Sequence, residues 1–250
     1  MASMLVVISV ALAGCDTASE RHEQEESATG EVVSFEASDG TRLSGRIFGD
    51  GRVGVIFAHM GRAGDTQTDW LPLARAVAAR GYTALTYNRR GVCNRSGKEC
   101  SDGPDDYATS WKDVLGASHF VRSRGVKAVV LVGASIGAMS MLYATATNRV
   151  AADALVEIGG VNHRSGYDFT REQLEEIQGA KLFISSALDS YGGADAAREW
   201  YGWARQPKRL EIFDGGAHGT ELLLTTEPTA KPLIELVVRF LEQAAPPGSD

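Results

Sequence analysis

The chain has 250 residues, 44% of them apolar, and a formal net charge of −7. A negative net charge disfavours binding to a polyphosphate surface, so nucleic acid is not expected as a partner. The length suits a single domain, with enough apolar residues for a sheet that is covered on both faces.

The first segment is a short apolar run, Met4–Ala13, followed by Gly14 and Cys15. At ten residues it is too short for a membrane-spanning helix, but it fits the apolar core of a signal peptide. Residues 12–15 (LAGC) resemble the lipobox of bacterial lipoproteins, in which the cysteine is lipidated. We therefore expect a signal peptide over 1–14 and a lipid anchor on Cys15. This places the protein in the bacterial cell envelope, attached to a membrane on the periplasmic side or outer surface.

Three alternatives to this reading stay open. The residues before the apolar run contain no Lys or Arg, so a simple secretory signal or an upstream start is also consistent. A third interpretation makes Cys15 a buried cysteine of a core helix.

Residues 15–30 differ in composition from the rest of the chain. From Asp16 to Gly30 there are five acidic residues, one arginine and no large apolar side chain. Such a segment cannot bury enough apolar surface to fold, so we expect a disordered tether. The folded domain is expected over residues 31–245.

The remaining pattern predicts strands that alternate with helices. Residues 31–37 and 41–48, joined by a turn at 38–40, are expected to form an antiparallel hairpin. Further strands are predicted at 53–58, 82–87, 126–132, 154–158, 181–188 and 209–213, and helices at 70–80, 107–124, 138–146, 170–178, 194–204 and 231–243. This order predicts an α/β fold: a mostly parallel sheet of about eight strands with helices on both faces.

One strand leads directly into a candidate catalytic serine. Ala128–Gly137 reads AVVLVGASIG, a β-branched strand followed by a Gly-x-Ser-x-Gly turn centred on Ser135. A tight strand-to-helix turn of this kind lifts a serine hydroxyl above the sheet edge. Side chains at Gly133 and Gly137 would clash across the turn. The helix that follows directs backbone N–H groups towards an oxyanion formed beside Ser135.

A nucleophilic serine needs a base and an orienting carboxylate, and both candidates follow in the chain. His218 lies in a glycine-rich loop after a predicted strand, and Asp189 stands at the end of the predicted strand 181–188. Active sites of open α/β sheets gather at the carboxyl ends of the strands. Glu157, at the end of another predicted strand, is the alternative acid. We expect a structural role for His59 and no catalytic role for the other histidines, His22, His119 and His163.

At this point the chain resembles the α/β-hydrolase family, and more closely its compact members similar to dienelactone hydrolase, over about residues 31–241. The motifs are GASIG at 133–137, LDS at 188–190, GAHG at 216–219, His59-Met60-Gly61, and Asn88–Gly91 where relatives often carry Asp-x-Arg-Gly.

The resemblance implies a triad of Ser135, Asp189 and His218, and an oxyanion hole formed by the N–H of Ile136 with that of Gly61. Met60 stands where relatives usually have glycine, which leaves open whether Met60 or Gly61 supplies the second amide. The short connection over 159–179 implies a minimal cap and an open cleft.

The two remaining cysteines, Cys93 and Cys100, lie in one loop. In an exported protein an even pair in a short loop predicts a disulfide, with two unlinked thiols as the alternative.

These observations together predict a serine hydrolase that cleaves small carboxylic esters through an acyl-enzyme. No metal or organic cofactor is required for this chemistry, and no His and Cys spacing suggests a zinc site. The same triad would also serve a peptidase or a lactone hydrolase. A further alternative is a non-catalytic envelope lipoprotein that uses the fold as a binding module, which the Met60 departure favours.

Overall fold

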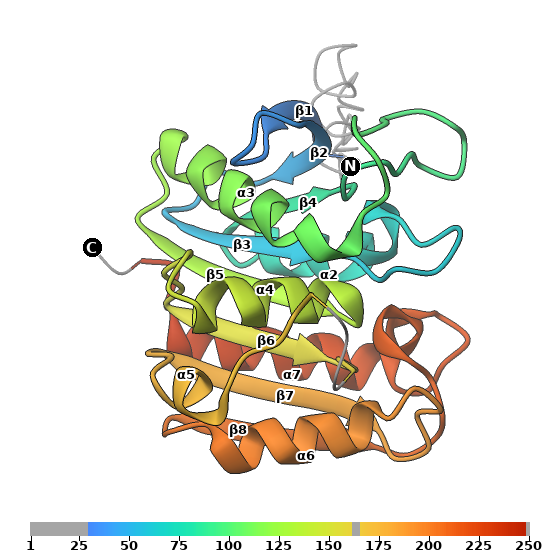
Figure 1. The fold of residues 1–250 in the computed structure, drawn as a ribbon, viewed down its shortest axis with the longest axis vertical. Coiled ribbons are helices and arrows are strands. Elements are labelled where there is room, and N and C mark those ends of the chain that lie inside the picture. Colours follow the sequence, from blue (N-terminus) through green and yellow to red (C-terminus); the bar gives the residue numbers. More distant parts are fainter. Residues whose placement is uncertain (1–29, 162–165, 249–250) are drawn as a thin grey trace, which may run out of the picture.

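The computed structural model describes residues 30–161 and 166–248, which form a single sheet flanked by helices (Figure 1). Its eight strands are β1 (Glu31–Glu36), β2 (Arg42–Phe48), β3 (Val53–Ala58), β4 (Thr83–Tyr87), β5 (Ala128–Ala134), β6 (Ala154–Ile158), β7 (Ala180–Ser186) and β8 (Lys208–Phe213). The helices are α2 (Leu71–Ala78), α3 (Trp111–Ser123), α4 (Ile136–Ala146), α5 (Arg171–Glu175), α6 (Gly193–Trp203) and α7 (Ala230–Ala244), with short 3₁₀ turns at Gln67–Trp70, Tyr107–Thr109 and Gly219–Leu223.

The strand order is β1-β2-β4-β3-β5-β6-β7-β8. The hairpin β1–β2 and the pair β2–β4 are antiparallel, and every other pairing is parallel. This architecture confirms the predicted fold, an α/β-hydrolase sheet with an N-terminal antiparallel hairpin. Because parallel strands need crossovers, the connecting helices cover both faces.

Two hydrophobic cores lie on opposite faces of the sheet. Along β5, Val129 and Leu131 pack under α3, α4 and α6, whereas Val130 and Val132 pack against α2 and α7. In Figure 1 these two sets of helices lie in front of and behind the sheet. The alternation along the strand therefore explains why β5 is apolar at every position.

The structure corrects several predicted boundaries, among them the ends of β7 and α5. Strand β7 ends at Ser186, because the chain then turns and the Asp189 N–H bonds back to the Ser186 carbonyl. Leu188, expected inside that strand, is 76% exposed. Helix α5 covers only Arg171–Glu175 of the expected 170–178, since the Ile177 N–H bonds three residues back to the Leu174 carbonyl. Gly179 then turns the chain into β7 with a φ of +76°.

The helix starts also differ from the predicted ones. Thr66 caps a 3₁₀ turn ahead of α2, where the sequence predicted a helix only from residue 70. Helix α4 begins directly after Ser135 at Ile136, two residues earlier than expected. In the second case the earlier start brings the helix N-terminus up to the candidate nucleophile.

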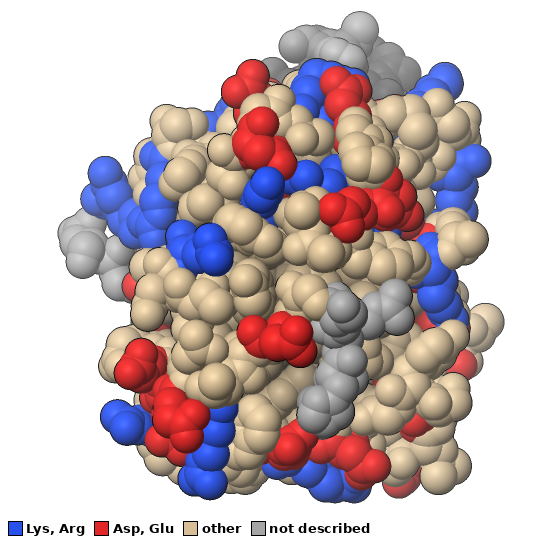
Figure 2. Space-filling view, viewed as in Figure 1, with Lys and Arg blue, Asp and Glu red and all other residues tan. Residues whose placement is uncertain are grey.

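The face of the molecule shown in Figure 2 has no continuous basic patch. On the face shown in Figure 2, Lys and Arg side chains are scattered among Asp and Glu. Within residues 30–161 and 166–248, no helix is long and apolar enough to cross a membrane.

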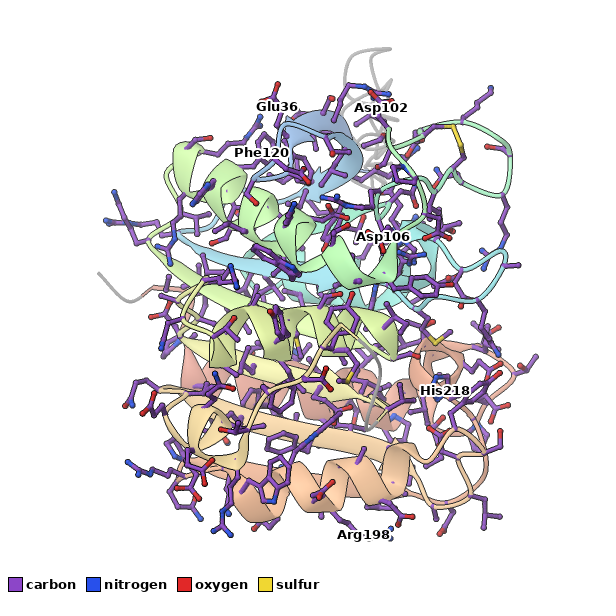
Figure 3. All side chains as sticks on the ribbon, in the orientation of Figure 1. Glu36, Asp102, Asp106, Phe120, Arg198 and His218 are labelled. Carbon is purple, nitrogen blue, oxygen red and sulfur yellow. A yellow bond between two sulfur atoms is a disulfide. The ribbon has the colours of Figure 1, made fainter. Side chains whose placement is uncertain are left out.

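His218 lies at the end of the molecule to which the parallel strands point (Figure 3), as does the disulfide loop.

Candidate active site

Ser135 occupies the tight turn between β5 and α4. Its backbone has φ 51° and ψ −119°, a strained conformation for a residue with a side chain. The turn is held by the Ser135 N–H, which donates to the Ile158 carbonyl at 3.0 Å. A Cβ atom at Gly137 would lie 2.1 Å from the Ala58 carbonyl oxygen, and one at Gly133 would lie 2.7 Å from the Ala138 nitrogen. The glycines of the motif are therefore required by close backbone contacts.

His218 and Asp189 form a buried pair. The His218 Nδ1 lies 2.8 Å from the Asp189 Oδ2, and their side chains are 3% and 0% exposed. With the Nδ1 proton donated to the carboxylate, the Nε2 of a neutral imidazole is left as an acceptor. The pairing gives the imidazole a defined tautomer and orientation.

The Asp189 carboxylate is itself held in place by its own loop. Its Oδ1 accepts the Tyr191 N–H at 2.9 Å, and its Oδ2 lies 3.4 Å from the Ser185 hydroxyl. A Cβ at Gly193 would lie 2.4 Å from the same Oδ2, so α6 approaches this carboxylate through a glycine. Both oxygens are thus engaged, although the residue lies beyond the strand end.

Glu157, the alternative acid, has a different environment. It is 1% exposed, its Oε1 accepts the Gly160 N–H, and its Oε2 has no hydrogen-bond partner among the described residues. Burial raises the pKa of the Glu157 carboxyl to about 8. Its hydrogen bonds favour the ionised form and lower the pKa, but burial has the larger effect. Glu157 makes no hydrogen bond to His218 within the described chain, so the carboxylate placed to orient that imidazole is Asp189.

His59 orients the loop of residues 59–62, which we call the oxyanion loop. Its Nδ1 lies 2.7 Å from the Met60 carbonyl oxygen, and its Nε2 accepts the Arg89 N–H at 3.0 Å. Burial and the neighbouring Arg89 charge lower the pKa of His59 to about 3, so the ring is neutral. Because the ring is neutral and its Nε2 accepts a hydrogen bond, its Nδ1 carries the proton. His59 therefore donates to the Met60 carbonyl and fixes the direction of that carbonyl.

This arrangement bears on which amide faces the candidate nucleophile. The Met60 carbonyl also accepts from Arg89 Nη1 at 3.0 Å, and the peptide that follows it is trans. The C=O and N–H of a trans peptide point in opposite directions, so the Gly61 N–H points away from His59 and Arg89. The Met60 side chain borders a separate groove, whereas Gly61 borders the pocket of Ser135. The Gly61 amide is therefore the better candidate donor.

Four of the predicted residues, Ser135, Ile136, Gly61 and His218, line one pocket of about 180 Å³. Its other walls are Arg62, Tyr107, Val161 and Tyr191. Ser135 and His218 face this pocket without a direct hydrogen bond between them in the described structure, as is common before substrate binds. The pocket is of a size for a small acyl group.

Besides Arg62 and Val161, three residues around this pocket were not identified from the sequence. The Tyr191 ring lies with its centroid 4.4 Å from that of His218, and the Tyr107 hydroxyl donates to the Gly61 carbonyl. Glu221 accepts the His218 N–H at 2.8 Å, completing a capping box. Its position three residues after His218 is a recognisable capping-box spacing, whereas the tyrosine contacts have no local signal.

The cysteine loop and two further pockets lie outside this site. Cys93 and Cys100 form the predicted disulfide. Arg95, inside that loop, borders the groove of about 370 Å³ that also contains Met60 and Arg62. The loop therefore flanks a neighbouring groove and supplies no residue to the pocket of Ser135.

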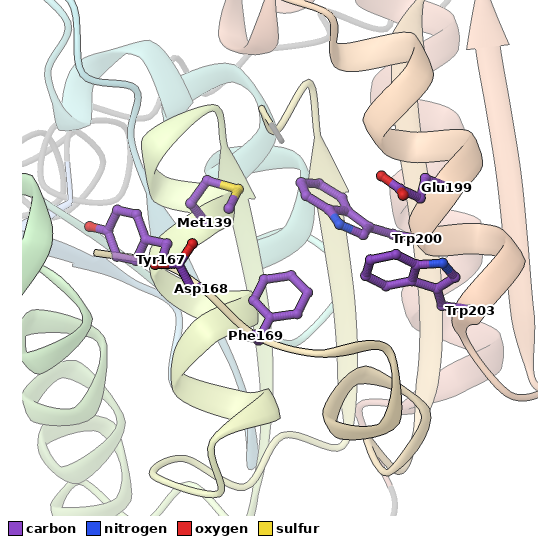
Figure 4. Close-up of a pocket in the computed structure, with 7 residues that line it drawn as sticks. All are labelled: Met139, Tyr167, Asp168, Phe169, Glu199, Trp200 and Trp203. Atoms are coloured by element: carbon purple, nitrogen blue, oxygen red, sulfur yellow. The ribbon is translucent and has the colours of Figure 1, made fainter. Parts of the chain in front are cut away.

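The other pocket, of about 70 Å³, lies between the segment 167–169 and α6 (Figure 4). Phe169, Trp200 and Trp203 line it together with the carboxylates of Asp168 and Glu199. It shares no lining residue with the pocket of Ser135.

Several sequence predictions fall outside the described residues. These are the signal peptide over 1–14, the lipid anchor on Cys15, the tether over 15–30 except its last residue, and His22 and His163. Among the residues that are described, no three His, Cys, Asp or Glu side chains are grouped to hold a metal ion.

The sequence profile of the alpha/beta hydrolase family matches residues 55–245. The chain therefore belongs to the alpha/beta hydrolase family, as its motifs predicted. None of the curated protein sequences matches it.

The fold is shared with solved structures at low sequence identity. The chain is similar to the esterase domain of a Rhodothermus marinus protein, with 19% identity and a TM-score of 0.65 over 86% of this chain and 98% of that one. A Pyrococcus furiosus esterase has 12% identity and a TM-score of 0.71, covering 88% and 95%. Dienelactone hydrolase from Anabaena variabilis has 16% identity and a TM-score of 0.65, covering 86% and 98%.

Proposed function

We propose that this chain is a serine hydrolase that cleaves small carboxylic esters through an acyl-enzyme, with Ser135, His218 and Asp189 as its triad. The observation that carries the proposal is one pocket of about 180 Å³ bordered by Ser135 in its strained turn and by His218 held by Asp189 at 2.8 Å. Family membership and the esterases among its structural neighbours support the hydrolase class.

In the proposed mechanism His218 accepts the proton of the Ser135 hydroxyl as the oxygen attacks the ester carbonyl carbon. Asp189 stabilises the resulting imidazolium without itself taking the proton. The N–H groups of Ile136 and Gly61 stabilise the oxyanion, and each such donor is typically worth about 3–4 kcal/mol. Collapse of the intermediate expels the alcohol, which receives its proton from His218.

Deacylation repeats the chemistry with water. His218 removes a proton from a water molecule that attacks the acyl-Ser135 carbonyl, and it returns the proton to the Ser135 oxygen as the carboxylic acid leaves. These steps need only side chains and amides of this chain.

The size of the pocket supports a short acyl group, and Tyr191 and Val161 supply it with apolar walls. A peptidase or lactone hydrolase would use the same residues and differ only in the bond placed over Ser135. The non-catalytic alternative is less well supported, since the Met60 side chain that favoured it borders the neighbouring groove.

We further propose that the protein is exported and anchored to a membrane of the bacterial cell envelope through a lipid on Cys15. The proposal depends on the apolar run and LAGC motif of the sequence. Mass spectrometry of the membrane fraction would detect the acylated peptide. A C15S variant is expected to move to the soluble fraction.

The test of the catalytic proposal compares hydrolysis of p-nitrophenyl acetate and butyrate by the wild-type protein and S135A. We expect turnover by the wild type and background rates in S135A, together with labelling of Ser135 by a fluorophosphonate. Aminoacyl anilides and small lactones serve as competing substrates. Equal rates in wild type and S135A, without labelling, would exclude the proposed catalysis and favour a binding module.

A further inference from the structure

The oxyanion loop contacts a segment distant in the sequence, residues 216–221, which we call the histidine loop. The first follows β3 and carries Gly61, and the second follows β8 and carries His218. Both loops border the pocket of Ser135. Catalysis as proposed requires the Gly61 amide and the His218 imidazole at fixed positions around the same substrate carbonyl.

The Glu221 carboxylate connects the two loops. Its Oε2 accepts the backbone N–H of His218 at 2.8 Å, and its Oε1 accepts from Arg62 Nη1 at 2.7 Å. Partial burial opposes ionisation of Glu221, but the His218 amide and the Arg62 guanidinium outweigh it and lower its pKa. The same carboxylate thus holds the base and the residue next to the oxyanion donor.

Arg62 is fixed at both its backbone and its side chain. Its backbone N–H donates to Asp65 Oδ2 at 2.8 Å, while its guanidinium reaches Glu221. The adjacent Gly61 carbonyl accepts from the Tyr107 hydroxyl. The peptide units on both sides of Gly61 are therefore restrained, with Glu221 providing the connection to the histidine loop.

Met60 supplies a second contact between the loops. It is 1% exposed, and its Sδ accepts the Thr220 N–H at 3.3 Å. A Cβ at Gly219 would lie 2.4 Å from the same sulfur, so the histidine loop passes directly over the Met60 side chain. A glycine at position 60, as in relatives, would leave this space empty.

We infer that Arg62, Glu221 and Met60 are positioning residues that hold the Gly61 amide in register with His218. The inference rests on the proposed function and goes beyond it. On this inference Met60 is a contact between the two loops. Its presence where relatives have glycine is then not a defect in the oxyanion hole. An Arg–Glu pair that is only a surface ion pair would contribute little, and its loss would leave turnover unchanged.

A double-mutant cycle tests the inference with R62Q, E221Q and the double variant. We expect each single variant to lower kcat for p-nitrophenyl acetate about 10- to 100-fold, since small misplacements of reacting groups cost this much. In E221Q, KM is expected to change less than kcat, because Glu221 does not line the pocket of Ser135. The losses should not multiply in the double variant, because either change breaks the same link.

The matched control is E242Q, which breaks the ion pair between Glu242 on α7 and Arg80, just beyond the C-terminal end of α2, joined at 2.6 Å. It should leave kcat unchanged. M60L is a second variant, since leucine keeps most of the apolar volume but cannot accept the Thr220 N–H. It is expected to lower kcat less than E221Q does, with circular dichroism showing a retained fold.

Unchanged kcat in folded R62Q and E221Q would overturn the inference, as would a loss in E221Q no larger than that in E242Q. S135A is measured beside them. A wild-type rate no higher than that of S135A would overturn the proposed function, whereas a rate that depends on Ser135 but not on Glu221 would overturn only the positioning role.

Discussion

Replacing Glu157 with glutamine should make the stability of the protein less sensitive to pH between about 4.5 and 8. Burial gives the Glu157 carboxyl a pKa of about 8, against 4.5 for a free glutamic acid. In the folded protein it is therefore protonated at neutral pH, whereas in the unfolded chain it is ionised. Unfolding then releases a proton, so stability falls as the pH rises from about 4.5 to about 8 and is level above this range.

The magnitude follows from the difference between the two pKa values. At about 1.36 kcal/mol per pKa unit, the whole shift corresponds to about 5 kcal/mol, of which about 3 kcal/mol is lost by pH 7. Glutamine keeps an oxygen for the Gly160 N–H, but its amide nitrogen would replace the unpartnered Oε2. An unpaired buried donor costs about 1–3 kcal/mol.

E157Q should thus be somewhat less stable than the wild type at pH 5 and more stable at pH 8.5. Guanidinium unfolding at pH 5, 7 and 8.5 measures both free energies of unfolding. E235Q is the control, because Glu235 on α7 is 49% exposed and its charge is solvated in both states. Parallel pH dependences for the wild type and E157Q would refute the assignment of a neutral, buried Glu157.

Three other changes have defined outcomes. D189N should lower kcat for p-nitrophenyl acetate by roughly 10⁴-fold through loss of the His218 tautomer, and a rate within 10-fold of the wild type would contradict Asp189 as the orienting acid. Replacing Cys93 and Cys100 with serine should lower the free energy of unfolding by about 2–2.5 kcal/mol, measured by denaturant titration, because the bond closes a short loop. Y191A should reduce kcat/KM for the butyrate ester about 10-fold and for the acetate ester less, since the lost ring borders the pocket. Equal losses for both esters would argue against contact between this ring and the acyl chain.

The fold was predictable because its signals are local. The strands β3 and β6 were predicted with their observed boundaries, since buried parallel strands are continuous apolar runs between polar turns. The same rule placed the end of β7 at Leu188, which was wrong. An apolar residue that continues such a run is indistinguishable in sequence from one that lies, 76% exposed, in the following loop.

The candidate site was predictable in its residues and only partly in its contacts. The turn around Ser135 has fixed glycine spacing, which backbone sterics require. The bond between Arg62 and Glu221 joins residues 159 positions apart, and the sequence contains no signal for such a pairing. The choice between the Met60 and Gly61 amides depends on the contacts of the Met60 carbonyl with His59 and Arg89. Arg89 comes from a separate loop, so the sequence left the second donor open.

The strand order of the sheet has a consequence for when the protein becomes active during synthesis. Ser135 follows β5, in the middle of the sheet, whereas His218 follows β8, the last strand and one of its edges. A growing chain therefore presents the proposed nucleophile long before the base that activates it. Hydrolysis should begin only after the final strand has docked, which makes ester turnover a reporter of completed folding and leaves nascent chains inert.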